Sequence, residues 1–400
     1  MHTRRDTMSR VLDPRIGRLS FSAFVSMAIV AGMLAACSGT DEPASLEAPA
    51  TVTPADPGAA ATSSPAASTP TPGSASVSDA TPGRSRANNQ DPGRLEWLGE
   101  RWYLHGANVA WLNWACDFGC GDEDGVSSTA SQALLHERFQ EAEAAGIKNL
   151  RWWLFPGEPW QIDTADDGTP VGIHSTVFQD LDAALDLARE YDFYLTLVIF
   201  AGADNMPGTW LSDERQRAAL AEVLGNELFA RYHGHDHIFS WDVINEPEWE
   251  IWDGQVEREP LQDLVRRVVG EVREKGSGYV TVGSATTDGI PIWKDAGLDY
   301  YQPHWYDHMD SGDWCAWCAT AGDIRDRYGV DEPVVVGEYF GGESVDALER
   351  YEGFRERGYA GAWPWSLFPG RTEDGMAIDL AASATFADHH DDIGPADAAR

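Results

Sequence analysis

Apolar and polar positions divide residues 94–400 into short apolar runs that alternate with longer segments of helical periodicity. Several of the runs are continuous apolar segments, which is typical of parallel strands buried on both faces. The pattern therefore predicts eight strands: Trp102–Ala110, Asn149–Phe155, Phe193–Phe200, Ile238–Ile244, Tyr279–Gly283, Tyr300–Trp305, Pro333–Gly337 and Tyr359–Trp365.

Segments between these strands carry apolar residues at three- and four-residue spacing, which predicts helices. They are Ala133–Ala145, Phe178–Glu190, Asp213–Tyr232, Gln262–Glu274 and Val345–Arg357, and no clear pattern lies between the fifth and seventh strands. Eight strands joined by crossovers over about 300 residues predict an α/β fold, a (β/α)8 barrel. An open doubly wound sheet is the alternative, but the first βα turn, HGANVAW, lacks the glycine-rich phosphate motif typical of that fold.

The N-terminal segment predicts processing rather than a folded element. Arginines between Arg4 and Arg18 precede an apolar stretch from Leu19 to Ala36, which ends in LAAC. This order is typical of a secretory signal, and its end resembles the lipobox of bacterial lipoproteins, in which the cysteine becomes the lipidated first residue. We expect residues 1–36 to be the signal and Cys37 to carry a lipid that anchors the protein to the bacterial membrane outside the cytoplasm. An uncleaved membrane anchor is the alternative.

Residues 37–93 are rich in Ala, Ser, Thr, Pro and Gly, and the domain at 94–400 follows them. The stretch has no aromatic residue and too little apolar bulk to offset ordering entropy, so we expect a disordered linker. The formal net charge is −36, with no basic stripe for nucleic acid. We expect a monomer whose partners are its substrate and the membrane.

The other four cysteines form two close pairs, Cys116 with Cys120 and Cys315 with Cys318. Outside the cytoplasm such cysteines normally form disulfides. Four cysteines allow three pairings, and the sequence does not choose between two local bridges and two bridges that link the loops. A four-cysteine zinc site is the competing interpretation.

Polar and aromatic side chains gather where the predicted strands end, which in a barrel is where catalytic groups lie. In chain order they are Asn108, Trp111, Arg151, Trp153, Asn245, Glu246, His304, Tyr306, Glu338, Trp363 and Trp365. Each has an ordinary alternative, since a single strand-end carboxylate is usually a solvated rim residue. Their joint occurrence at strand ends favours a site.

Two carboxylates on different strands suit cleavage of a glycosidic bond. The reaction needs a proton for the leaving oxygen and a carboxylate for the developing cation at the anomeric carbon. Glu246 and Glu338 can divide these tasks if their surroundings separate their pKa values. Arg151 and Tyr306 are suited to orienting one carboxylate, and Asn245 to holding a sugar hydroxyl.

These residues, in this order, resemble family 5 glycoside hydrolases, a cellulase- and mannanase-like family in the clan of (β/α)8 retaining glycosidases. The resemblance implies that Glu246, in Asn245-Glu246-Pro247, is the acid/base and that Glu338 is the nucleophile. It also matches Arg151 to the second-strand arginine of the family. His304 and Tyr306 match its sixth-strand His-x-Tyr, and Trp365 its eighth-strand tryptophan. The family usually carries a histidine near the end of the third strand, whereas VIFAGADN contains none.

The resemblance implies a retaining enzyme that cleaves a β-linked polysaccharide or oligosaccharide, of the β-1,4-mannan or β-glucan type, by double displacement. We expect sugar rings to stack on tryptophans near the strand ends, above all Trp249 and Trp252 directly after the acid/base motif. No cofactor or metal is needed for this chemistry. The histidine-rich run at 233–237 precedes the fourth strand, so we expect it at the opposite end of the barrel.

Two other functions stay open at this point. One is an exo-acting β-glycosidase or transglycosylase of the same clan, which the loops of the cleft would decide. The other is a non-catalytic glycan-binding lipoprotein, although such proteins usually lose a catalytic carboxylate and both are present here. A metal-dependent hydrolase barrel is disfavoured because no His-x-His follows the first strand. No residue that we can name distinguishes mannan from β-1,4-glucan.

Overall fold

The computed structural model describes residues 93–309, 314–372 and 375–394. The predicted signal at 1–36, the lipidated Cys37 and the linker up to residue 92 lie outside this part of the chain. Among the described residues, no helix is both long enough and apolar enough to cross a membrane.

Eight parallel strands form a single sheet in the order β10-β9-β8-β7-β4-β3-β12-β11. The first and last strands of this order also meet, because Tyr301 pairs with Val334 and accepts a backbone hydrogen bond from Val335 at 2.9 Å. The predicted (β/α)8 barrel is therefore confirmed. Its strands are β3 (Leu104–Ala110), β4 (Asn149–Phe155), β7 (Tyr194–Phe200), β8 (Ile238–Asn245), β9 (Tyr279–Ser284), β10 (Gln302–Pro303), β11 (Val335–Phe340) and β12 (Gly361–Trp365).

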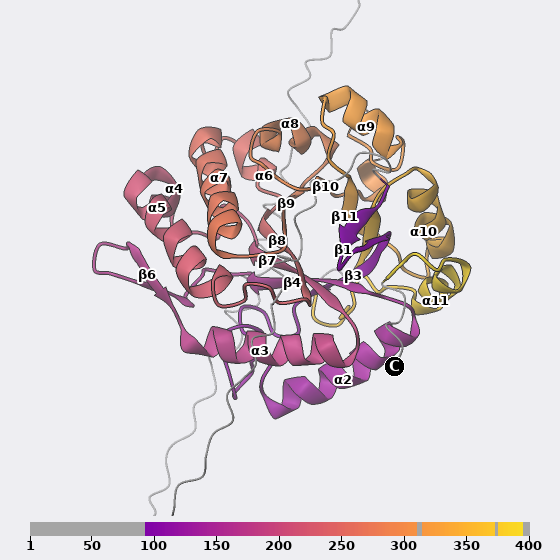
Figure 1. The fold of residues 1–400 in the computed structure, drawn as a ribbon, viewed down its shortest axis with the longest axis horizontal. Helices are drawn as coiled ribbons and strands as arrows, with labels where there is room; N and C mark the ends of the chain where they lie inside the picture. The colour runs from indigo at the N-terminus through magenta and orange to yellow at the C-terminus, as the bar shows by residue number, and fades with distance from the viewer. Residues whose placement is uncertain (1–92, 310–313, 373–374, 395–400) are drawn as a thin grey trace, which may run out of the picture. The chain divides into compact units, whose positions relative to one another are not determined.

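Helices follow the strands and surround the barrel (Figure 1). Most bury one apolar stripe against the strands, as α7 does with Leu261, Leu264, Val265 and Val268. The helices are α2 (Thr129–Ala144), α3 (Ser175–Glu190), α4 (Gly208–Ser212), α5 (Glu214–Val223), α6 (Glu248–Trp252), α7 (Arg258–Lys275), α8 (Ile290–Trp293), α9 (Ala321–Tyr328), α10 (Ala347–Glu356) and α11 (Leu380–His389), with short helical turns η1 (Leu224–Phe229), η2 (Thr287–Gly289) and η3 (Asp307–Met309).

The structure differs from the predicted elements in several places. The predicted strand Tyr300–Trp305 is reduced to Gln302–Pro303, and Trp102 belongs to β2 (Glu100–Trp102) rather than to the first barrel strand. The helix predicted at 213–232 ends as an α-helix at Val223 and continues as the π-helical turn η1. The fifth and sixth strands are followed by α8, of four residues, and α9, of eight. Helices this short contain too few turns to show a helical periodicity, so the pattern of apolar and polar positions did not reveal them. Finally, β11 runs past the predicted end at Gly337, so Glu338 lies within the strand.

A small hairpin that the pattern did not predict lies at the amino end of the barrel strands. Its strands are β1 (Leu95–Trp97) and β2 (Glu100–Trp102). Trp97 packs against Phe239 and Tyr279 at ring-centroid distances of 5.3 and 5.8 Å, and its indole donates to the carbonyl of Asp236 at 3.0 Å. Strands of three residues are too short for alternation to identify. The hairpin closes the amino end of the barrel with aromatic side chains. We call this buried layer the aromatic plug, and its aromatic residues are Trp97, Trp102, Tyr194, Phe239, Tyr279, Tyr300 and Trp363.

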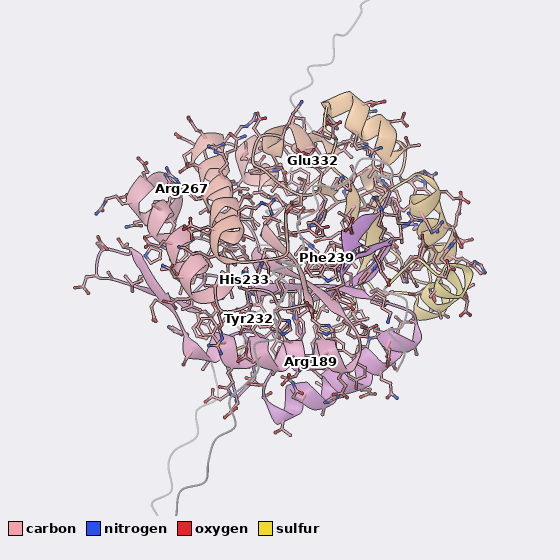
Figure 2. The ribbon with its side chains drawn as sticks, in the orientation of Figure 1. Arg189, Tyr232, His233, Phe239, Arg267 and Glu332 are labelled. Atoms are coloured by element: carbon pink, nitrogen blue, oxygen red, sulfur yellow. A yellow bond between two sulfur atoms is a disulfide. The ribbon has the colours of Figure 1, made fainter. Side chains whose placement is uncertain are left out.

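The histidine-rich run lies at this same end, as predicted. The ring nitrogen of His233 is 2.8 Å from the carbonyl of Gly276, and that of His237 is 2.8 Å from the carbonyl of Phe193. Figure 2 labels His233 together with Phe239, which belongs to the aromatic plug. These two histidines therefore fasten the loop that enters β8.

A second hairpin, β5 (Ile162–Thr164) with β6 (Pro170–Ile173), follows β4 before α3 begins. It is anchored to the helical layer, since the N–H of Ile173 donates to Glu227 at 2.8 Å. The insertion thus extends the loop at the carboxyl end of β4, the end of the barrel where the candidate site lies.

Candidate active site

Arg151 of β4 is the centre of a buried polar network at the carboxyl ends of the strands. The guanidinium is fully buried and binds Asp242 through Nε and Nη2, both at 2.9 Å. It also donates to Glu338 Oε1 at 2.6 Å and to Asn245 Oδ1 at 2.7 Å. The plane of Trp153 covers it, with the guanidinium carbon 4.3 Å from the ring centroid. A planar donor fork with several acceptors fixes all of these groups at once.

Asp242 is the residue of this network that the sequence interpretation missed. It is fully buried in β8, and besides Arg151 it accepts from Gln302 at 2.7 Å and from the N–H of Gly283 at 2.8 Å. The available signal was a single acid within the apolar run WDVI, because a buried carboxylate needs a partner. Arg151 is the partner of this carboxylate, and Asp242 in turn keeps the guanidinium of Arg151 charged inside the barrel.

Two glycines make room for this network. A Cβ on Gly283 would stand 2.5 Å from Arg151 Nη2, and a Cβ on Gly337 would stand 2.5 Å from Gln302 Cγ. Both distances are shorter than any real contact, so any side chain there would displace the network. The strand-end sequences GYVTVGS and VVVGEYF thus use glycine for close approach rather than for a turn.

Glu246 follows β8 in a backbone conformation that is uncommon for a residue with a side chain. Its φ is +44°, and the pairing of β8 with β9 shifts register between Asp242 and Asn245. Its N–H donates to the carbonyl of Gly283. Left-handed backbone at a non-glycine residue carries strain that surrounding contacts must hold, and such residues gather at functional sites. The bend aims the carboxyl group of Glu246 into the barrel mouth.

Both carboxylate oxygens of Glu246 are hydrogen-bonded. Oε1 lies 2.8 Å from His304 Nδ1, and Oε2 accepts from the indole of Trp249 at 3.0 Å. Burial raises the pKa of Glu246 to about 7, and the hydrogen bond from Trp249 and the charge of Arg151 act against that rise. Burial lowers the pKa of His304 to about 4, so this ring is neutral near pH 7 and adds no positive charge beside Glu246.

Glu338 has different neighbours. Its Oε1 accepts from Arg151, and its Oε2 accepts from the phenol of Tyr306 at 2.9 Å. His304 Nδ1 is 3.6 Å from the same Oε2. Oxygens of Glu338 and Glu246 lie within 4.8 Å of each other, with His304 within the same distance of both. The site therefore holds two adjacent carboxyl groups, one bound by a guanidinium and a phenol and the other by two neutral rings.

Glu246, His304 and Glu338 are also the donor set, among the described residues, that is spaced closely enough to hold a cation. The carboxylate oxygens and His304 Nδ1 are already engaged with one another, with Trp249, with Tyr306 and with Arg151. The guanidinium of Arg151, 2.6 Å from Glu338, repels any second cation at that oxygen. This arrangement suits proton transfer better than metal binding.

Tryptophans line the mouth around these carboxyl groups. Trp111, after β3, packs edge-to-face against Trp365 of β12 with ring centroids 5.9 Å apart, and Trp365 meets Trp153 at 5.4 Å. Val198 and Ala201, at the end of β7, pack against these tryptophans. β7 is the third barrel strand, after which the sequence lacks the histidine that is usual in the family. In α6, which follows β8, Trp249 packs edge-to-face against the half-exposed Trp252, with ring centroids 5.3 Å apart. These indoles offer flat apolar surfaces for sugar rings.

Two residues proposed to bind substrate lie elsewhere. Trp363 is fully buried in the aromatic plug and donates to the carbonyl of Leu104 at 3.1 Å, so its indole faces away from the mouth. Trp363 and Trp365 are two residues apart on β12, so both indoles face the barrel interior, but they lie at different heights along its axis. The amide of Asn108 is fully buried and donates to the carbonyls of Gly337 and Trp363, while its oxygen accepts from Arg151. Neither side chain is placed to contact a sugar.

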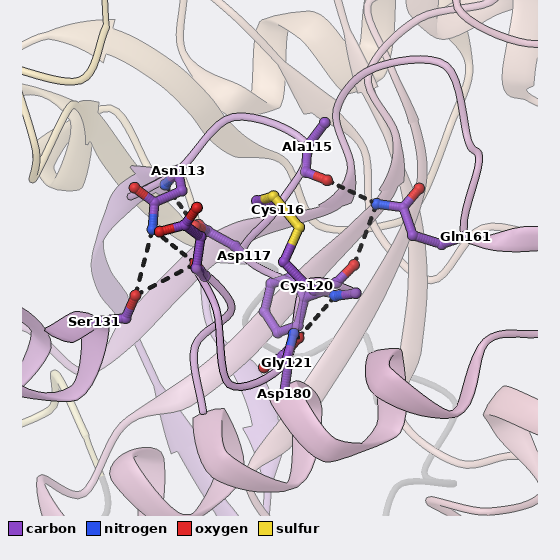
Figure 3. The surroundings of a disulfide bond; sticks show 12 residues. Asn113, Ala115, Cys116, Asp117, Cys120, Gly121, Ser131, Gln161 and Asp180 are labelled. Carbon is purple, nitrogen blue, oxygen red and sulfur yellow. Dashed lines mark hydrogen bonds between the residues drawn. A yellow bond between two sulfur atoms is a disulfide. The ribbon is translucent and has the colours of Figure 1, made fainter. Parts of the chain in front are cut away.

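The cysteines form two local disulfides, Cys116–Cys120 and Cys315–Cys318. The zinc alternative is thereby excluded for them, because a disulfide sulfur is not a thiolate ligand. The first bridge closes the loop after β3, which Figure 3 shows held by Asp180 of α3. That carboxylate accepts from the N–H groups of Gly119 and Gly121 at 2.8 and 2.9 Å. Both bridges stiffen loops that follow barrel strands at the mouth.

No protein-family model matches the chain. Two curated relatives are each 24% identical to it, and both are named mannan endo-1,4-beta-mannosidase. The one from Mytilus edulis aligns with 68% of this chain and 85% of its own length. The one from Cryptopygus antarcticus aligns with 68% of this chain and 82% of its own length.

Solved structures with the same fold carry related names. The beta-mannanase of the blue mussel Mytilus edulis has a TM-score of 0.60 at 20% identity, and covers 76% of this chain and 96% of its own. The beta-1,4-mannanase of Aplysia kurodai has a TM-score of 0.61 at 19% identity, with 75% and 96% covered. A family 5 glycoside hydrolase mannosidase from Rhizomucor miehei has a TM-score of 0.51 at 13% identity, with 75% and 95% covered. The resemblance to family 5 glycoside hydrolases that the sequence predicted is therefore confirmed.

Proposed function

We propose that this protein is a retaining endo-β-glycanase that cleaves β-1,4-linked mannan by double displacement. The observation that carries the proposal is the placement of Glu246 and Glu338, with carboxylate oxygens within 4.8 Å of each other. Carboxyl groups about 5 Å apart suit retention, because the nucleophile then reaches the anomeric carbon directly. Inversion needs about 6.5–9.5 Å, to leave room for a water molecule.

In the first step, Glu338 attacks the anomeric carbon while Glu246 donates its proton to the leaving glycosidic oxygen. Arg151 and Tyr306 hold the two oxygens of Glu338, which aims the ionised carboxylate at the carbon. Glu246 is suited to the acid role because a pKa of about 7 keeps it protonated at neutral and lower pH. The glycosidic bond breaks and a glycosyl ester on Glu338 forms.

In the second step, Glu246 is a carboxylate and takes a proton from water, whose oxygen attacks the anomeric carbon. The ester bond to Glu338 breaks, and the sugar leaves with its original β configuration after two inversions. Asn245 gives its amide oxygen to Arg151, and we assign its NH2 group to a hydroxyl of the sugar at the cleavage point.

The substrate class rests on the relatives. Both curated relatives carry the name of endo-acting enzymes on β-1,4-mannan, and they align with most of their own length. One structural relative is instead named an exo-beta-1,4-mannosidase, at a TM-score of 0.51 and 16% identity. We therefore assign the endo mode to this chain and keep the exo mode as the second candidate.

A panel of linear β-glycans tests this assignment. Purified protein is expected to release reducing ends fastest from β-1,4-mannan, with oligosaccharides of mixed length as the early products and the β anomer formed first by NMR. Release of single sugars from the start would show the exo mode. Faster cleavage of β-1,4-glucan would reject mannan as the preferred glycan, and binding without cleavage of any glycan would show a non-catalytic glycan-binding protein.

We also propose that the enzyme acts outside the cytoplasm as a monomer, anchored by a lipid on Cys37. The two disulfides of the described domain support an oxidising compartment. The Cys37→Ser variant is expected to appear in the soluble secreted fraction or to remain unprocessed. Normal processing with unchanged membrane retention would contradict lipid anchoring. Light scattering of the protein released from the membrane gives its oligomeric state.

A further inference from the structure

Trp249 stands directly beside the proposed acid. Its indole N–H donates to Glu246 Oε2 at 3.0 Å, and its backbone N–H donates to the carbonyl of Glu246 at 3.3 Å. A single turn of chain thus folds the indole back onto the carboxyl group three residues earlier. The contact is formed entirely within the segment that begins α6, so it depends on how that short helix is held.

The neighbours of Trp249 on α6 fix its orientation. Glu248 is fully buried and accepts from the N–H of Ala285 at 2.9 Å and from the indole of Trp293 at 2.5 Å. On the outer side, the ring of Trp252 packs edge-to-face against Trp249. The indole of Trp249 is half-buried against the core, so it cannot turn away from Glu246 without breaking these contacts.

The charged and titratable groups that face Glu246 come from several elements. Arg151 of β4 and His308 of η3 favour its ionised form, whereas Glu338 of β11 and Glu250 of α6 are further acids near it. His304 is neutral near pH 7. Trp249 and His304 are both neutral and both hydrogen-bonded to Glu246, but an indole N–H can only donate, whereas a neutral imidazole nitrogen can donate or accept.

We propose that Trp249 is a positioning residue for Glu246. Its indole N–H fixes the orientation of the carboxyl group and stabilises the carboxylate that forms when the proton has left. This inference rests on the proposed function, in which Glu246 donates a proton in the first step and accepts one in the second. A donor that favours the carboxylate makes Glu246 a stronger acid toward an unactivated glycosidic oxygen.

The Trp249→Phe variant removes the N–H and keeps an aromatic ring. The alkaline limb of kcat/KM on β-1,4-mannan is expected to move up by about one pH unit, because a hydrogen bond to a charged group contributes roughly that much. The rate on mannan should fall about tenfold at the pH optimum, and much less on an aryl glycoside with an activated leaving group.

Trp252→Phe is the matched control. It removes an indole N–H from the same helix, but Trp252 contacts Trp249 rather than Glu246. Its alkaline limb should stay at the wild-type pH, whatever happens to KM. If Trp249→Phe raises KM and leaves the alkaline limb in place, Trp249 is only a platform for a sugar ring and the inference is wrong.

NMR of the wild-type protein tests the positioning role of Trp249 even if Trp249→Phe does not fold. With 15N-labelled tryptophan, one indole N–H resonance should titrate at the pH of the alkaline limb, and this titration should vanish in Glu246→Gln. If no indole resonance follows that pH, the inference is rejected. Failure of the proposed function is distinguishable, because Glu246→Gln would then keep full activity on mannan.

Discussion

The two ends of the barrel are made from the same eight strands, yet they differ in chemistry. At the amino end, Trp97, Phe239 and Tyr279 form the aromatic plug. At the carboxyl end, Arg151 gathers Asp242, Asn245 and Glu338 around one guanidinium. β8 passes through both regions: it contributes Phe239 to the plug and Asp242 to the network, and Glu246 follows its last residue.

This difference shows how the fold can tolerate a charged interior. Buried charges are costly unless they are paired and hydrogen-bonded, so the network at the mouth is held by mutual contacts rather than by apolar burial. The plug buries aromatic surface and contains none of the groups proposed to react. We therefore expect substitutions at the mouth to change activity and substitutions in the plug to change stability.

The largest effect is expected from Glu338→Ala. Loss of the nucleophile should lower kcat on mannan by about 10⁴-fold or more, as removal of a covalent nucleophile does elsewhere. Added azide or formate should restore turnover of an activated glycoside, with the product inverted, because a small anion fits where the carboxylate was. Near-wild-type activity on mannan would show that Glu338 is a charged residue at the rim of the barrel mouth and not the nucleophile.

Glu246→Ala should have the next largest effect, and one that depends on the leaving group. We expect a loss of about 10²–10⁴-fold on mannan, the usual contribution of a general acid, and a much smaller loss of the first step on an activated aryl glycoside. Kinetics on both substrates measure the contrast. An equal loss on the two would mean that Glu246 does not supply the proton.

Trp97→Ala tests the opposite end of the barrel. Removal of this buried indole should destabilise the protein by about 3–5 kcal/mol, since it leaves a cavity in the plug. The kcat of the folded protein should stay near wild type. Leu98→Ala, at an exposed neighbour, is the control and should cost less than about 0.5 kcal/mol. A large fall in kcat for Trp97→Ala would contradict the expectation that the plug affects stability and the mouth affects activity.

The smallest effect concerns the pH dependence of stability. Burial and the nearby Asp204 raise the pKa of Glu250 from its ordinary value of 4.5 to about 8. Between these values the unfolded chain has released this proton and the folded protein retains it, so stability falls as the pH rises toward about 8. Glu246 and Glu248, with pKa values of about 7, contribute the same sign at lower pH.

Wild-type Tm should therefore decrease from about pH 7 to about pH 9, and Glu250→Gln should reduce that decrease by about 2–4 °C, equivalent to about 1 kcal/mol. Calorimetry at the two pH values measures it. Glu257→Gln, at an exposed position shortly after α6, is the matched control and should leave the decrease unchanged. A Tm of Glu250→Gln that follows the wild type would show that Glu250 is ionised in the folded protein.

Several features followed from the sequence because they depend on local pattern. Continuous apolar runs identified all eight barrel strands, and their polar ends located Arg151, Glu246, His304 and Glu338, which the structure brings together. One local signal was overlooked: Thr320 and Asp323 form a capping box that marks the start of α9. The roles of these site residues remain predictions.

Other features were decided only by the tertiary structure. Trp363 and Trp365 were both predicted to bind substrate, although the family resemblance covered only Trp365. The barrel interior places the indole of Trp363 in the plug and that of Trp365 at the mouth, since height along the barrel axis depends on the stagger of all strands. The cysteine pairing, the partnership of Asp242 with Arg151 and the unequal neighbours of the two glutamates likewise join residues that are distant in the chain. Periodicity reports which way a residue faces within its own element, whereas these contacts depend on how the elements are packed together.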